Sequence, residues 1–369
     1  MKQILLLAMV ALFVNFIDNY SLPRFSLQQK DKCSSCHFNP TGGGMRNESG
    51  FYFGKNIVGM ISPRDQDIIL SPKLTENVSF GLDYRSQFLY SAEKKKTDFQ
   101  DMTGSIYLNA SIAKNIDVTA RYDFVNSIWE AFGTAKILPN ESYIKVGSFI
   151  PNYGIRLDDH TSYTRGGDFG LLFSTGAIQG LYLNPFYVET GLELGLNLSS
   201  ISSLTASVGK SKFNSVFTTD PTYTARFEIM PSIDKLTFLL GGSFASAKTR
   251  NFGNFLSTKM FGGFAGIGYE RFTIMGEYDI ANDYIGSDIK SNALMVEASY
   301  QITVGLDAIV RYDSFDPSID LNDDEHSHLV LGMEFFPFSF VEIRPQYRIN
   351  IETPEKKNDA LVVQFHFWY

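Results

Sequence analysis

In the stretch TVGLDAIVRYDS, residues 303–314, every second side chain from Val304 to Tyr312 is apolar, and the charged residues occupy the alternate positions. Its alternate positions sort by polarity into Val304, Leu306, Ala308, Val310 and Tyr312 on one side and Asp307, Arg311 and Asp313 on the other. Successive side chains of a β-strand point to opposite faces, so this strand has one apolar and one charged face. Such a strand suits a wall that separates lipid from a polar interior.

The same alternation recurs from about residue 76 to residue 369, without helical periodicity. It predicts sixteen strands, at 77–90, 102–113, 116–126, 128–138, 141–150, 185–197, 202–210, 222–230, 235–247, 257–269, 272–281, 290–300, 303–314, 327–336, 340–350 and 360–369. A soluble β-sandwich also alternates, but it rarely sustains so many strands with almost no charge on the apolar positions. We therefore predict an all-β fold, a 16-stranded antiparallel transmembrane β-barrel.

The predicted connections alternate between tight turns and longer polar loops, as in outer-membrane barrels. The connection at Asn126-Ser127 is an exception, because it should be long and is short. The insertion 151–184 is long enough to fold into the lumen, although an external loop is an alternative. The last strand ends on Trp368-Tyr369 and resembles the terminal signal of bacterial barrels.

The first residues have the layout of a secretory signal: Lys2 precedes an apolar run from Ile4 to Ile17. We predict a signal peptide at 1–21. No other stretch offers the roughly 18 to 20 apolar residues of a transmembrane helix, so a spanning structure has to be a closed barrel. The aromatic content of 14% agrees with a barrel. The net charge of -8 argues against nucleic acid as a partner.

Both cysteines of the chain lie in one motif, Cys33-Ser34-Ser35-Cys36-His37. This is the signature of c-type haem attachment, in which Cys33 and Cys36 bind the haem and His37 is the first iron ligand. A zinc site lacks further ligands nearby, and a thioredoxin-like pair lacks its βαβ context. A short disulfide remains an alternative. We predict one covalent haem c.

The segment 22–75 precedes the barrel, at 76–369, and is too small to enclose a haem unaided. We therefore predict a short N-terminal haem-binding plug at the periplasmic mouth, with the barrel completing the enclosure. For the second iron ligand, Met60 is slightly preferred over Met45, and a methionine would raise the reduction potential. The histidines that remain are His160, in the insertion, and His326, His328 and His366, in the barrel.

The charges predicted to face the lumen include Asp83, Asp123, Glu193, Glu228 and Asp279, and most of them are acidic. A lumen of that sign attracts cations, including metal ions. An ordinary polar pore lining without a selected substrate is an equally good interpretation.

The succession of a signal peptide, Pro23-Arg24-Phe25, a single Cys-x-x-Cys-His, Phe53-Gly54-Lys55 and a barrel resembles the fused outer-membrane cytochrome-porins associated with iron(II) oxidation. The resemblance implies a redox protein rather than an ordinary enzyme. It implies one haem at Cys33, Cys36 and His37, an extracellular electron donor such as iron(II), and a periplasmic electron carrier such as a cytochrome. Outer-membrane lipid would surround the barrel.

Two other functions remain open on the sequence. The chain could be a passive diffusion porin whose cysteines form a structural pair, or a haem-bearing redox sensor. Absence of haem absorbance from the purified protein would favour the porin.

Overall fold

A computed structural model describes residues 23–63, 68–156, 161–167, 180–211, 220–251, 254–355 and 357–369. The predicted signal peptide at 1–21 and His160 lie outside these residues. Among the residues described, no helix is long and apolar enough to cross a membrane.

The strands form one closed sheet. Their bounds are β1 (Val78–Ser91), β2 (Lys96–Ala113), β3 (Ile116–Asp123), β4 (Ile128–Ala135), β5 (Tyr143–Phe149), β6 (Glu189–Ser199), β7 (Ser202–Ser211), β8 (Thr222–Ile229), β9 (Ser232–Ile233), β10 (Leu236–Asn251), β11 (Asn254–Tyr269), β12 (Phe272–Asn282), β13 (Lys290–Thr303), β14 (Leu306–Asp316), β15 (His326–Phe335), β16 (Val341–Glu352) and β17 (Ala360–Trp368). Neighbours pair antiparallel, and β1 closes the sheet by pairing with both β2 and β17.

The short strand β9 continues β8 rather than adding a wall position. Both pair with β10, on either side of Pro231, which has no amide hydrogen to donate to the ladder. The chain is therefore a closed 16-strand antiparallel β-barrel, which confirms the predicted fold and strand count.

The two faces of the wall are sorted as the alternation predicts. In β14, Asp307, Arg311 and Asp313 are buried inside the barrel, whereas Val310 is 47% exposed on the outside. The same holds in β16, where Glu342 and Arg348 are buried and Tyr347 is exposed. Polar groups buried within and apolar groups exposed outside are the reverse of a soluble protein and match a lipid-facing wall.

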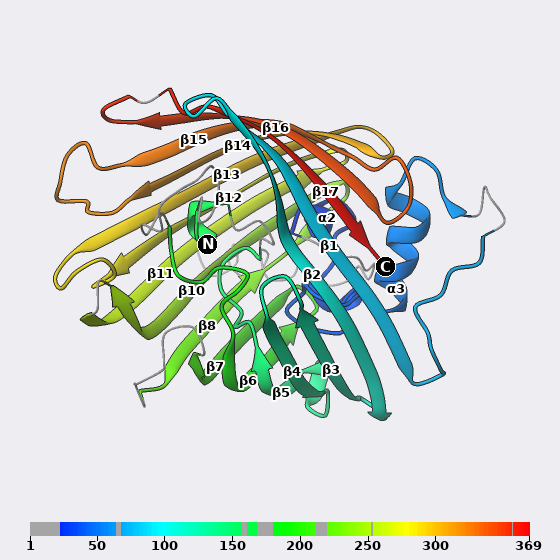
Figure 1. Cartoon of the computed structure of the whole chain (residues 1–369). Helices are drawn as coiled ribbons and strands as arrows, with labels where there is room; N and C mark the ends of the chain where they lie inside the picture. The colour runs from blue at the N-terminus through cyan, green and yellow to red at the C-terminus, as the bar shows by residue number, and fades with distance from the viewer. Residues whose placement is uncertain are drawn as a thin grey trace, which may run out of the picture.

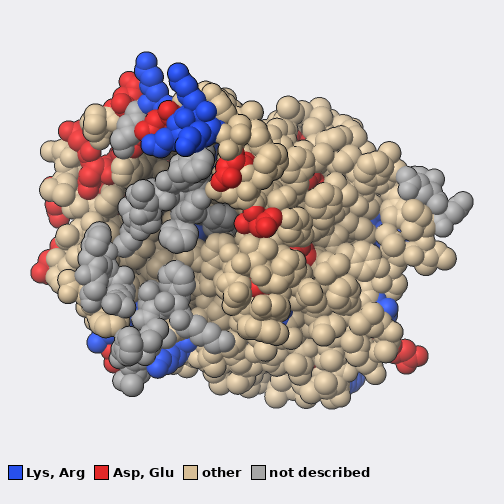
Figure 2. All heavy atoms as spheres, viewed as in Figure 1, with Lys and Arg blue, Asp and Glu red and all other residues tan. Residues whose placement is uncertain are grey.

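Figure 1 shows the barrel from the side, with the helix α2 (Pro23–Gln29) inside the wall and α3 (Glu48–Phe53) near the C-terminus at one mouth. In Figure 2 the wall on the right of the view is largely free of charged side chains. Lys, Arg, Asp and Glu gather instead at the left-hand end. The barrel thus has an uncharged outer band of the kind that contacts lipid.

Some strands extend beyond their predicted ends. Residues 96–101 belong to β2 and pair with β1 beyond a bulge, where the sequence predicted a loop. Likewise β10 and β11 continue to Asn251 and Asn254. Beyond the lipid, side chains on both faces of a strand contact water, so polar residues there do not end the strand.

The connection between β3 and β4 is short, as the sequence indicated. Asp123 accepts hydrogen bonds from the amides of Val125 (3.1 Å) and Asn126 (3.0 Å), and Ser127 takes a positive φ of 55°. An aspartate that bonds the backbone two or three residues ahead stabilises a tight turn. β3 and β4 have eight residues each, against sixteen in β10, so the wall is low here.

The long insertion after β5 folds into the lumen wherever it is described. Tyr153 and Tyr182 are buried against lumen-facing residues of the wall, among them Met260. The Arg165 Nη2 donates to Glu277 of β12 (2.8 Å). For the described residues of this insertion, the lumenal alternative is correct.

Candidate haem-attachment segment in the barrel lumen

The Cys-x-x-Cys-His motif forms a single helical turn inside the barrel. Its first residues are the 3-10 turn η1 (Cys33–Ser35), and the amides of Cys36 and His37 both donate to the Cys33 carbonyl, at 3.3 and 3.2 Å. Cys36 is 3% exposed and His37 is 5% exposed. The two cysteines are not joined to each other.

Three successive glycines turn the chain back past this motif. Gly42, Gly43 and Gly44 have φ values of 83°, 69° and 65°, a region that favours glycine. A Cβ at Gly42 would lie 2.9 Å from the Cys33 Cβ, and one at Gly43 would collide with the Arg156 guanidinium. The glycines therefore bring the chain against Cys33 and Arg156.

The side chain of Asn47 joins the motif to α3. Its amide nitrogen donates to the Ser35 carbonyl (3.0 Å), and its backbone amide donates to the Cys36 carbonyl (2.9 Å). Its side-chain oxygen accepts from the Gly50 amide (3.0 Å), which caps α3. Motif and helix therefore behave as one unit.

Two buried charges fasten the N-terminal segment to the wall. The Lys145 Nζ of β5 donates to the Asn39 side-chain oxygen (3.1 Å) and pairs with Glu193 of β6 (2.7 Å). At the other side, Arg24 of α2 pairs with Glu334 of β15. Leu27 of α2 packs into an apolar cluster with lumen-facing residues of β10 to β13.

Cys36 and His37 line a cavity of about 1240 Å³, a volume that includes space open to solvent, as do the two volumes given below. Its apolar lining includes Phe25, Phe53, Val58, Met275, Phe336 and Trp368, and its charged lining includes Arg24, Arg46, Arg85, Arg156, Arg344, Glu334 and Glu342. His37 also lines a second cavity, of about 1050 Å³, and Cys33 lines a third, of about 870 Å³. The motif thus lies where three spaces of the lumen adjoin.

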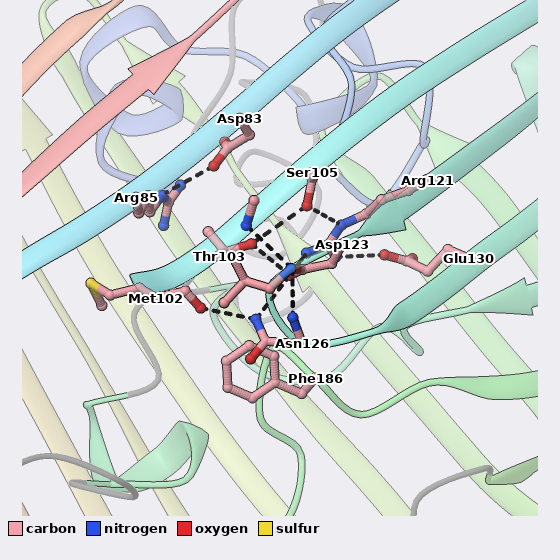
Figure 3. A network of polar contacts seen from close by, with 12 residues as sticks. Asp83, Arg85, Met102, Thr103, Ser105, Arg121, Asp123, Asn126, Glu130 and Phe186 are labelled. Atoms are coloured by element: carbon pink, nitrogen blue, oxygen red, sulfur yellow. Dashed lines mark hydrogen bonds and ion pairs between the residues drawn. The ribbon is translucent and has the colours of Figure 1, made fainter. Parts of the chain in front are cut away.

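Arg156, on the lumenal insertion, lines all three cavities. In the part of the chain that the structure describes, no carboxylate lies within 4.0 Å of its guanidinium. Arg121 differs: it pairs with Glu130 (2.7 Å) and Asp123 (3.2 Å). Figure 3 shows this network, with Asp123 also accepting from Thr103 (2.6 Å). Among the described residues, Arg156 is therefore a cation available to an anionic group here.

Among the residues that the structure describes, the lumen holds more positive charge than the strands alone predicted. The N-terminal segment adds Arg24 and Arg46, and the insertion adds Arg156 and Arg165. These cations come from segments outside the strands, so counting the lumen-facing positions of the strands could not reveal them.

The structure does not bring either predicted methionine ligand into the cavity that His37 lines. Met45 is buried, and its side chain lies against Gly81 of β1, at 3.5 Å from a Cβ placed there. Met60 is 45% exposed, and its amide donates to the Phe336 carbonyl (2.9 Å) at a barrel mouth. The assignment of either one as an iron ligand stays a prediction.

The barrel histidines have carboxylate partners. His326 lies 3.6 Å from Glu352, and His328 lies 3.0 Å from Asp313. His366 lines the cavity of His37, but its two ring nitrogens contact Glu342 (3.0 Å) and Asp83 (3.1 Å). The described residues hold no group of three or more His, Cys, Asp or Glu arranged for a metal ion.

Sequence reasoning missed Met275 and Arg156 as residues of the site. The parity of strand 272–281 could have placed Met275 on the lumenal side, since Thr273 and Glu277 share its face. Nothing in the sequence could have placed Arg156 against Gly43, because that contact depends on how the insertion folds.

No protein-family model and no curated protein matches the sequence. Solved structures do match it. The outer-membrane channel DcaP of Acinetobacter baumannii is 12% identical, with a TM-score of 0.58 over 81% of this chain and 100% of that one. OprB of Pseudomonas putida is 11% identical, with a TM-score of 0.61 over 86% and 100%. OmpF of Salmonella typhi, solved with daunomycin, is 14% identical, with a TM-score of 0.55 over 79% and 98%.

Identities this low show the fold alone. That fold is a porin-type β-barrel, the architecture of these bacterial outer-membrane proteins, and the uncharged outer band of the wall agrees with a place in that membrane.

Proposed function

We propose that the barrel holds one haem c, attached to Cys33 and Cys36 with His37 as iron ligand, and that it passes single electrons across the outer membrane. The observation that carries this proposal is the shared position of Cys36 and His37, both buried and lining one cavity inside the barrel. The N-terminal segment is too small to house a haem alone, and the wall supplies the remainder of the enclosure.

The residues around the cavity fit such a group. Phe25, Phe336 and Trp368 provide apolar surface for a porphyrin. A haem also carries two propionates, and arginine is the side chain best suited to carboxylates. Arg156 has no carboxylate partner among the described residues and adjoins Cys33, so it supports a propionate contact.

When bound, the haem would supply one-electron chemistry, and the chain would set its conditions. His37 would hold the iron from the motif. The apolar side chains of the cavity would exclude water from the porphyrin, and nearby arginines would favour the reduced, less positive iron. Lys145, through Asn39, would keep the motif fixed to the wall. A rigid attachment avoids structural change during electron transfer.

The electron donor would lie outside the cell, with iron(II) as the first candidate, and a periplasmic cytochrome would accept the electron. The sequence resemblance to cytochrome-porins supports this assignment. Figure 1 shows α3 at the same barrel mouth as the C-terminus. We assign this mouth to the periplasm, because the short turns of outer-membrane barrels face that side. A periplasmic electron carrier would then reach the haem-attachment segment from this mouth.

The test uses intact cells that make the full chain together with the c-type maturation machinery. Iron(II) added outside should reduce the haem in wild-type cells. It should fail in a His37→Ala variant that reaches the membrane in equal amount. A haem that dithionite reduces but external iron(II) never reduces would overturn iron(II) as donor, and failure of every external donor would overturn the transfer role.

A passive diffusion porin is the second candidate, and the fold itself favours it, because porins and an outer-membrane channel share this architecture. Conductance of the purified chain in planar bilayers separates the two. A steady open-channel conductance in protein that holds no haem supports diffusion. A closed, haem-containing barrel supports electron transfer.

A further inference from the structure

A methionine lies on the lumenal face of β12, where its neighbours are polar. Alternate residues of that face are Thr273, Met275, Glu277 and Asp279, and all four are buried. Met275 is 4% exposed and lines the cavity that Cys36 and His37 line. A thioether at this position breaks the polar pattern of the strand and shares a cavity with the haem-attachment motif.

Among the described residues that line this cavity, few could bind iron opposite His37. Cys36 would be consumed by the covalent bond to the haem. His366 contacts Glu342 and Asp83 through its two ring nitrogens. Glu334 and Glu342 pair with arginines. Glu297, the third carboxylate of the lining, interacts electrostatically with Arg311 and Arg24. The thioether of Met275 takes part in none of these covalent or ionic contacts. Methionine is a common second iron ligand, opposite histidine, in c-type haems.

The packing around Met275 would hold its side chain in place. It belongs to an apolar cluster with Leu27, Ile155 and Met295, which draws on α2, the insertion and β13. Behind it, Gly266 of β11 has no side chain, and a Cβ there would lie 3.3 Å from the Met275 Cβ. Because Leu27 precedes the motif by only six residues, the cluster ties Met275 to the haem-attachment segment.

We propose that Met275 is the second axial ligand of the haem iron, in place of Met45 or Met60. This inference rests on the proposed haem. The sulfur donates a lone pair to the iron, and no bond is broken and no proton or electron is transferred in forming this contact. A sulfur ligand raises the reduction potential above that of a haem with two nitrogen ligands, which suits an acceptor of electrons from a weak donor.

The test compares purified, matured wild type with Met275→Leu. Haem content is measured first, as the pyridine haemochrome. The ferric wild type should show the long-wavelength charge-transfer band of methionine-ligated iron. Met275→Leu should keep its haem, lose that band, bind carbon monoxide when reduced and shift to a lower reduction potential.

Two controls separate ligation from packing. Met295→Leu changes a buried methionine of the same cluster that does not line the cavity, and Met60→Leu changes the methionine preferred on sequence grounds. Both should keep the band. If wild type carries haem but lacks the band, or Met275→Leu retains it, the ligand assignment is overturned while the haem stands. If the wild type carries no haem, the proposed function is overturned, and the ligand assignment is overturned with it.

Discussion

Lys145 carries a buried charge that joins the barrel wall to the lumenal segment. It is 0% exposed, as is Glu193, its partner at 2.7 Å. Removing one member of a buried pair leaves the other charge without compensation, which typically costs about 3–5 kcal/mol.

We expect Lys145→Met to lower the stability of the folded barrel by an amount in that range and to loosen the motif by losing the bond to Asn39. Urea unfolding followed by heat-modifiable gel mobility measures the stability. The double variant Lys145→Met with Glu193→Gln is the matched control and should recover part of the loss. Equal stability of wild type and Lys145→Met would contradict the anchoring role.

Cys33 is a second residue whose surroundings make a measurable prediction. Burial, with a contribution from Glu228, raises the pKa of its thiol to about 11. The thiolate is the reactive form, and at pH 8 only about a thousandth of the thiol would be ionised at any moment, so the reaction would be slow.

Alkylation of the haem-free protein by iodoacetamide should therefore be slow at pH 8 and accelerate about tenfold per pH unit up to pH 11. A Cys36→Ser variant isolates Cys33, and mass spectrometry follows the product. A rate that levels off near pH 8.5 would show an ordinary, solvated thiol.

At the scale of elements, the Gly42–Gly44 turn fixes how closely the chain passes Arg156. Gly43→Ala adds a side chain at a positive φ and against the guanidinium, and strain of this kind costs about 1–3 kcal/mol. We expect destabilisation, together with reduced haem incorporation. Gly263→Ala is the control, because a Cβ there meets nothing within 4 Å. Equal loss of stability in both variants would refute the close approach.

The same scale shows how far the sequence could predict this structure. All sixteen wall strands follow from alternation, because the lipid face tolerates almost no charge. Alternation did not reveal that residues 96–101 belong to a strand, because strand residues outside the lipid can carry charge on either face. The contacts within the haem-attachment site were harder to predict than the strands. Lys145 and Asn39 are 106 residues apart, and no local pattern links a wall lysine to a glycine-rich turn.

At the scale of the whole molecule, the insertion after β5 and the N-terminal segment together occupy the lumen. Arg165 secures the insertion by pairing with Glu277 (2.8 Å), and Ser162 donates to Asp313 (2.5 Å). Both contacts tie the described loop residues to the same part of the wall, at β12 and β14 on either side of β13.

We expect Arg165→Ala to release this loop, since Glu277 and Asp279 would be left as neighbouring buried carboxylates without their cation. The barrel should still fold, but its conductance in planar bilayers should rise severalfold. Lys235→Ala removes an exposed ion pair with Glu270 and serves as control. An unchanged conductance in Arg165→Ala would show that the loop does not limit passage.

We propose that this barrel covalently binds one haem in its lumen. The most direct test is the haem content of the full-length protein, made with the c-type maturation machinery, purified as a folded barrel and then denatured. We expect one covalent haem c per chain by pyridine haemochrome, and none in a folded Cys33→Ala, Cys36→Ala double variant. A folded wild-type barrel without covalent haem would contradict the claim and leave a diffusion porin.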